Sequence, residues 1–346
     1  MHWKVLPLKT FAICGDVAVT GFFVLSGFLI SYLLLHEQQK NINKENLIAV
    51  KKFYWRRILR IWPLYFMIIG LHTYLLPQLH IEDTIQLAHN PFLDKIALHL
   101  SQGQIFGFLI FFLPHLLVAM GVLFTPTHVW SIGSEEIFYI FWPWLFRKKI
   151  PLQKVIIAII VIYLVVTYGL FLYVLSQKDT LPFNHPWNVL VRFLYFQRIS
   201  CMGIGALFAI AFYYKKKIIF GNPKIFYGSV ILLSLLLLKG ITLPILNSEM
   251  YSLLFGIIIY NLVTVRYRFR LLENKMMKYL GDISYGIYMY NPMGVLFSYY
   301  INTQVLHYSG WSLSLSYTAM AIAITIALAS ISYYGVERYF LQWKPS

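Results

Sequence analysis

The sequence predicts an all-α protein that crosses a membrane several times. Hydrophobic residues make up 59% of its 346 residues and charged residues only 12%, whereas soluble domains carry roughly 25% charged residues. Apolar runs of about 20 residues recur along the chain, and each could cross the ~30 Å hydrocarbon core of a bilayer. The short alternating segments of a membrane β-barrel are absent. We therefore expect a polytopic integral membrane protein with a single transmembrane domain over residues 1–346.

The apolar runs divide into about nine crossing helices. In chain order they cover residues 15–35, 61–79, 132–146, 153–175, 191–213, 225–246, 250–265, 279–301 and 312–334. One more apolar segment, 105–123, is interrupted in its middle by Pro114 and His115.

The net charge of +16 is carried largely by loops between the apolar segments. Basic residues gather in 36–60, 147–154, 215–224 and 266–278, and the positive-inside rule assigns these loops to the cytoplasm. This distribution argues against a nucleic-acid partner and in favour of a lipid bilayer.

The number of crossings between the first two basic loops must be even, yet three apolar segments lie between them. The interrupted segment 105–123 is therefore expected to be a re-entrant or surface helix, which surrounding protein or a watery cavity can accommodate. This path places residue 1 on the outer side of the membrane and the C-terminus in the cytoplasm.

Two adjacent acids, Glu135 and Glu136, stand in an aromatic and apolar run. A charged side chain at the bilayer centre costs at least ~2.5 kcal/mol, so it needs a partner, a wet cavity or a proton. The pair predicts a polar site inside the membrane protein. Arg198 lies inside another apparent span, and we expect it to pair with Glu135 or Glu136, while Asp16 is expected at the membrane interface.

Three arginines, Arg56, Arg57 and Arg60, stand where a basic loop enters an apolar segment. Arg56 and Arg60 share a helix face because they are four residues apart. Guanidinium groups match the geometry of phosphate, so this cluster suits the diphosphate of a nucleotide-like donor. An anchor for anionic lipids is the alternative.

Four motifs occur in a fixed order along the chain. They are a small residue followed by FFVLSGFLI at 21–30, F-x-x-RR-x-x-R-I-x-P-x-Y at 53–65, WS-x-x-x-EE-x-F-Y-x-x-WP at 130–143, and G-x-ISY-x-IY at 281–288. In the first, Gly21, Ser26 and Gly27 are small enough to permit close helix contact. Together the motifs resemble the membrane acyltransferase-3 family over essentially the whole chain. Its members are bacterial O-acyltransferases, typically O-acetyltransferases of surface polysaccharides.

The resemblance implies about ten membrane helices, each long enough to cross the bilayer, and a bacterial inner-membrane location. It also implies transfer of an acyl group, typically acetyl, from cytoplasmic acyl-CoA to a sugar hydroxyl of a glycan or lipid-linked acceptor. The arginine cluster would bind the acyl-CoA. Whether the protein forms a homodimer is not decided by the resemblance. The competing readings are a transporter or flippase that uses the same buried charges, and an inactive truncated homologue.

The acids of this chain's third motif resemble those of the family. The family also uses a histidine on its first helix. Glu135 matches the more characteristic acid of the motif, with Glu136 beside it, and either could orient an imidazole or take the proton itself. His2 stands roughly where the family's histidine would, so we expect the chain to begin inside that helix and to lack its basic partner. His2 as a plain terminal residue is the alternative, and His128 is the fallback base.

The remaining candidates are polar residues for substrate contact or structure. They are Ser131, Arg198, Tyr288 and Asn291, the last at a place where relatives often resemble Tyr-x-x-His. The other histidines lack metal-ligand spacing, and the two cysteines suggest neither a disulfide framework nor a metal site, so no metal is expected.

Overall fold

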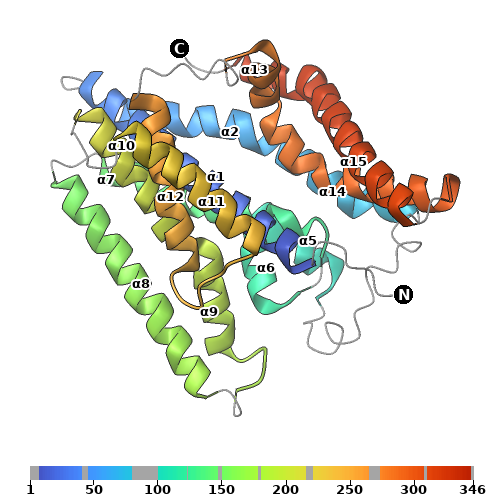
Figure 1. Cartoon of the computed structure of the whole chain (residues 1–346), viewed down its shortest axis with the longest axis horizontal. Helices are drawn as coiled ribbons and strands as arrows, with labels where there is room; N and C mark the ends of the chain where they lie inside the picture. Colours follow the sequence, from blue (N-terminus) through green and yellow to red (C-terminus); the bar gives the residue numbers. More distant parts are fainter. Residues whose placement is uncertain are drawn as a thin grey trace. The chain divides into compact units, whose positions relative to one another are not determined.

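A computed structural model describes residues 8–40, 46–79, 100–122, 124–146, 150–177, 181–215, 221–264, 273–307 and 310–343. Over these ranges the chain is helical, and no strand occurs in them (Figure 1). The prediction of an all-α fold is therefore confirmed.

Five helices among the described residues are long and apolar enough to cross a membrane. They are Ile13–Gln39, Val50–Gln78, Leu152–Ser176, Pro186–Tyr213 and Leu315–Leu341. Helices suit this setting because they satisfy every backbone polar group internally, where lipid offers no hydrogen bonds. The protein is thus a membrane protein, while about nine crossings and the side assigned to each loop stay predictions.

The chain falls into two compact units. Unit 1 comprises Met1–Ala49 and Ser134–Tyr267, and unit 2 comprises Val50–Gly133 and Arg268–Ser346. The single domain over 1–346 stays a prediction, and each unit is described here by itself.

Unit 1 is built around the contact of its first helix with a helix from the middle of the chain. Its helices are α1 (Leu8–Lys40), most of α7 (Trp130–Leu145), α8 (Leu152–Ser176), α9 (Pro186–Gln197), α10 (Ile199–Tyr213), α11 (Pro223–Lys239) and α12 (Asn247–Thr264). The most extensive packing joins α1 to α10, and α10 also packs against α8 and α12. Most of α10 is buried, so it forms the centre of this unit.

Glycines allow α1 and α10 to approach so closely. A Cβ atom on Gly27 of α1 would lie 1.9 Å from the carbonyl oxygen of Met202, and one on Gly205 of α10 would lie 2.0 Å from that of Val24. The predicted role of small residues in the first motif is confirmed for Gly27, because backbone atoms, and not a flexible side chain, fill the space.

Unit 2 pairs two long helices near the end of the chain. Its elements are most of α2 (Asn46–Gly70), η1 (Leu71–Leu75), η2 (Leu76–Leu79), α5 (Gln102–Ile110), α6 (Pro114–Met120), η3 (Thr127–Val129), α13 (Lys275–Asp282), α14 (Ser284–Tyr300), η4 (Ile301–Val305), α15 (Gly310–Ser332), η5 (Tyr333–Glu337) and α16 (Arg338–Leu341). The extensive packing of α14 along α15 depends on Gly294, whose Cβ would lie 2.0 Å from Oγ1 of Thr325.

Several expected helix boundaries were wrong, because some helices continue and others break at positions where the hydropathy of the sequence does not change. The expected loop 36–60 is largely helical, since α1 ends at Lys40 and α2 begins at Asn46, so the three arginines lie on a helix. The expected span 225–246 stops early, because Gly240 takes a left-handed conformation (φ 60°) and ends α11.

Two further segments are interrupted. The expected span 191–213 breaks at Arg198 into α9 and α10, and 279–301 breaks at Ile283 into α13 and α14. The segment 105–123 is also two short helices, α5 and α6, joined through Phe112 with φ 56°. That break agrees with the expectation of an interrupted segment.

We predict that Gly27→Ala destabilises the protein, because the new methyl group can be accommodated only if backbone atoms shift. Overpacking of this kind costs about 1–3 kcal/mol. Gly228→Ala on α11 is the matched control, since nothing lies within 4 Å of a Cβ there, and alanine favours a helix. Thermal unfolding in detergent should show a lower midpoint for Gly27→Ala only; equal midpoints for the two variants would contradict the packing account.

Candidate functional site

In unit 1, the carboxylate of Glu135 is held by two hydroxyl groups. Ser26 Oγ of α1 donates a hydrogen bond to Glu135 Oε1 at 2.7 Å, and Tyr139 OH donates to Oε2 at 2.9 Å. Tyr139 lies one helical turn after Glu135 on α7, so both side chains share a face. Hydrogen bonds to an ionised group are stronger than neutral ones, so the two hydroxyls stabilise the negative carboxylate and fix its position.

Further hydrogen bonds tie α7 to its neighbours in unit 1. Trp142 Nε1 donates to Ser31 Oγ of α1 at 2.8 Å, and both residues are buried. Ser134 Oγ donates to the carbonyl oxygen of Phe196 at 2.9 Å, near the end of α9. Because these bonds lie on either side of Glu135 in the sequence, the carboxylate is placed by helix packing and not by a mobile loop.

Glu136 follows Glu135 on α7 and is partly buried. Adjacent helix positions point about 100° apart, so the hydroxyl pair of Ser26 and Tyr139 serves Glu135. The choice of Glu135 over Glu136 as the principal acid, and the role of each, stay predictions.

Arg198 is one of the most deeply buried large side chains described in unit 1 and is only 2% exposed. Its guanidinium forms an ion pair with the carboxylate of Asp16 on α1, and it donates to Thr20 Oγ1 at 2.5 Å. The backbone of Arg198 is left-handed, with φ 44°, a conformation that costs a residue with a side chain roughly 1–2 kcal/mol.

The place expected for Asp16 at the membrane interface stays a prediction. The pairing expected for Arg198 with Glu135 or Glu136 was wrong, since the structure pairs Arg198 with Asp16. The reason is the helix break. It places Arg198 at the start of α10, beside the early part of α1, where Asp16 and Thr20 share a face one turn apart.

Glu249 is a carboxylate that the sequence analysis did not consider. Standing in the first turn of α12, it accepts hydrogen bonds from Tyr168 OH at 2.9 Å and from Ser200 Oγ at 2.7 Å. A lone acid at the edge of an apolar segment was the only available signal, and it did not reveal the tyrosine and serine partners that lie on other helices.

In unit 2, three predicted residues come together. Ser131 Oγ lies 2.7 Å from Tyr288 OH, and Tyr288 OH donates to the carbonyl oxygen of His128 at 2.5 Å. A tyrosine hydroxyl has one proton to give, so Ser131 must donate to Tyr288. The rings of His128 and Tyr288 lie 5.4 Å apart. Residues from the third and fourth motifs therefore form one hydrogen-bonded group.

Two buried histidines in unit 2 were not among the candidate residues for chemistry in the sequence analysis. His115 on α6 is fully buried, and a Cβ on Gly133 would lie 2.3 Å from its Nδ1, so the glycine makes room for this ring. His72 is 5% exposed and lies in the π-helical turn η1, a distortion common at functional sites. Only their place in apolar segments could have drawn attention to them.

His128 is poorly suited to act as a base. The pKa of His128 is lowered to about 3, mainly by burial and also by the nearby His72, while a backbone hydrogen bond at Met289 acts in the opposite direction. The ring is therefore neutral at pH 7 but has little affinity for a proton, whereas an efficient base has a pKa near the working pH. Its role as the fallback base stays a prediction.

The remaining candidates lie on α2 and α14 of unit 2 or outside the described residues. On α2, Arg56 and Arg57 are partly buried and Arg60 is exposed. Asn291 is exposed on α14, and His2 lies outside the residues that the structure describes. Within the described ranges, no group of three or more His, Cys, Asp or Glu side chains could hold a metal ion.

We predict that Asp16→Ala strongly destabilises the protein, because it leaves the buried guanidinium of Arg198 without its carboxylate. Breaking one side of a buried ion pair costs about 3–5 kcal/mol, whereas replacing both partners is often neutral. Asp16→Ala combined with Arg198→Met should therefore unfold at a higher temperature than Asp16→Ala alone. A double variant that unfolds below both single variants would show that the pair is not the source of the effect.

Comparison with known proteins identifies the family. The acyltransferase domain family matches residues 2–330. A candidate acetyltransferase of Acidianus two-tailed virus is 26% identical over 302 residues, covering 83% of this chain and 75% of the viral protein. A candidate O-acetyltransferase of Staphylococcus aureus (strain COL) is 25% identical over an alignment of 373 positions, gaps included, which covers 96% of this chain.

The chain spans only 55% of the length of that staphylococcal relative. An uncharacterised protein of Haemophilus influenzae is 27% identical over 201 residues, covering 55% of this chain and 72% of that protein. No solved structure matches the chain. Because the family match extends over nearly the whole sequence, this protein belongs to the acyltransferase-3 family and is an acyltransferase.

Proposed function

We propose that this acyltransferase moves an acyl group, in the simplest case acetyl, from cytoplasmic acyl-CoA to a hydroxyl of a cell-envelope or exported polysaccharide. The observation that carries the proposal is the 2.7 Å hydrogen bond from Ser26 to Glu135. It joins the first and third motifs at a carboxylate inside an apolar unit. Two relatives named as acetyltransferases, one of them an O-acetyltransferase, support transfer of acetyl to a hydroxyl.

The reaction requires a proton to leave the acceptor hydroxyl. Its oxygen attacks the thioester carbonyl carbon, a C–O bond forms, the C–S bond breaks, and the coenzyme leaves as a thiolate that takes up a proton. A carboxylate held negative by Ser26 and Tyr139 suits the task of orienting an imidazole base and stabilising the imidazolium that forms, as an aspartate does in hydrolytic triads. We assign this role to Glu135, with His2 as the imidazole.

The donor would be bound on α2. Three arginines lie within five residues of one helix, and guanidinium forks bind phosphate oxygens in pairs. Arg57 also lies with its guanidinium carbon 5.7 Å from the ring centre of Phe53, which limits its freedom. We propose that this cluster receives the phosphates of acyl-CoA at the cytoplasmic side of a bacterial inner membrane.

We predict that Glu135→Gln lowers acyl transfer by a factor of about 100 or more, the scale on which a proton-transfer group contributes, while expression is unchanged. The amide keeps the shape but cannot stabilise an imidazolium. The assay is transfer of labelled acetyl from acetyl-CoA in proteoliposomes. Glu273→Gln, at an exposed position outside the motifs, is the control.

Unchanged turnover in Glu135→Gln would reject the assignment. Movement of a substrate across the vesicle membrane, without covalent change in any variant, would instead favour a transporter.

A further inference from the structure

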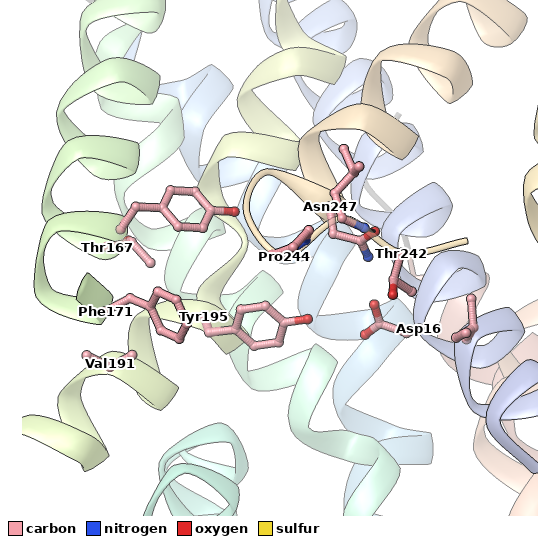
Figure 2. A pocket seen from close by; sticks show the side chains of 11 residues that line it. Asp16, Thr167, Phe171, Val191, Tyr195, Thr242, Pro244 and Asn247 are labelled. Carbon is pink, nitrogen blue, oxygen red and sulfur yellow. Dashed lines mark hydrogen bonds between the residues drawn. The ribbon is translucent and has the colours of Figure 1, made fainter. Parts of the chain in front are cut away.

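Unit 1 contains a pocket of about 390 Å³ that is separate from the carboxylate of Glu135 (Figure 2). Its size falls in the range of ~300–1,000 Å³ that small-molecule sites occupy. The lining comes from α1, α8, α9 and the segment 242–247 that leads into α12. On the topology predicted from the basic loops, this end of the unit faces the outer side of the membrane.

Polar groups gather on one side of the pocket. Figure 2 shows Asp16, Thr242 and Asn247 there. The carboxylate of Asp16 is 33% exposed, while its partner Arg198 is only 2% exposed. A molecule in the pocket would therefore meet the acid and not the arginine, and none of the described lining residues is Lys or Arg.

Aromatic rings line the other side. Phe171 lies opposite the polar group, and Tyr195 points its hydroxyl toward Asp16 (Figure 2). Tyr195 is held by the guanidinium of Arg198, whose carbon lies 5.2 Å from the ring centre. Tyr168 is fixed by its hydrogen bond to Glu249. Both tyrosine rings therefore have partners within the protein that restrict their orientation.

Thr167 completes the aromatic side of the pocket. The residue is 6% exposed, and its hydroxyl oxygen is buried with no hydrogen-bond partner among the described residues. This hydroxyl is therefore not offered to a ligand, and the polar groups that a ligand would meet are those of Asp16, Thr242 and Asn247.

We infer that this pocket binds an uncharged sugar ring of the acceptor and rejects sugars that carry a carboxylate or phosphate. The inference rests on the proposed transfer to a polysaccharide hydroxyl. A sugar ring has an apolar face of C–H groups, which suits Phe171 and Tyr195, and an edge of hydroxyls, which suits Asp16, Thr242 and Asn247. A second negative charge would face the exposed, negative end of the Asp16–Arg198 ion pair, which would repel it in this weakly polar surrounding.

The pocket would select the acceptor and not perform the transfer. Asp16 precedes Ser26 by ten residues on α1, which corresponds to a rise of about 15 Å. A glycan whose neutral sugar is bound beside Asp16 could therefore extend along α1, through further sugar units, toward the carboxylate that Ser26 holds. The residues of the pocket are positioning and specificity residues.

The test is direct binding of two matched probes, methyl β-D-glucopyranoside and methyl β-D-glucuronoside, which differ only in the carboxylate. The protein is purified in a detergent without a sugar headgroup, because such a headgroup would compete. We expect saturable binding of the neutral probe and at least about tenfold weaker binding of the anion.

Phe171→Ala and Thr242→Val should each weaken binding of the neutral probe by about fivefold to tenfold. Phe141→Ala, at a 68% exposed phenylalanine of α7 outside the pocket, is the control. Unfolding midpoints identify any variant that fails to fold. If Phe171→Ala fails to fold, the isosteric Thr242→Val still provides the test. Equal binding of both probes, no saturable binding, or pocket variants that match the control would overturn the inference.

Acetyl transfer from labelled acetyl-CoA to a polysaccharide, measured on the same preparations, separates the two proposals. Transfer that persists without sugar binding in the pocket overturns the inference alone. Sugar binding with the expected selectivity, but without acetyl transfer, overturns the proposed function and with it the role of this sugar as an acceptor.

Discussion

One hydrogen bond, from Ser26 to Glu135, connects the packing of unit 1 to its chemistry. A carboxylate in an apolar setting must be solvated by the protein itself, and here the solvation comes from a serine on α1 and a tyrosine on α7. Gly27 follows this serine on α1 and, with Gly205 of α10, allows the two helices to pack closely. The serine that binds the acid and the glycine that permits close packing therefore lie side by side on α1.

The first helix carries a series of such contacts along its length. Asp16 and Thr20 receive the buried Arg198, Ser26 holds Glu135, and Ser31 accepts from Trp142. The left-handed backbone of Arg198 is unfavourable alone, and its ion pair and hydrogen bonds offset that cost. The helix break at Arg198 also determines how Asp16 faces the pocket. One side of its carboxylate contacts Arg198 at the start of α10, and the other side is exposed.

The helices and the polar character of the site could be predicted from hydropathy and four motifs. Glu135, Ser131 and Tyr288 were named in advance, and the structure finds each in a hydrogen-bonded group. The partners could not be predicted. Pairing of Arg198 with Asp16 depends on a helix break that hydropathy does not reveal, and Glu249 gains its partners only through packing. Periodicity describes single helices, whereas such contacts depend on register between them.

The most direct measurement is a double-mutant cycle between Ser26 and Glu135 in acyl transfer. Ser26→Ala, Glu135→Gln and the combined variant would be compared by kcat/KM. If the serine acts through the carboxylate, the combined variant should be as slow as Glu135→Gln alone, because the serine has nothing left to hold. Losses that multiply in the combined variant would show that the two residues act independently and would contradict the account.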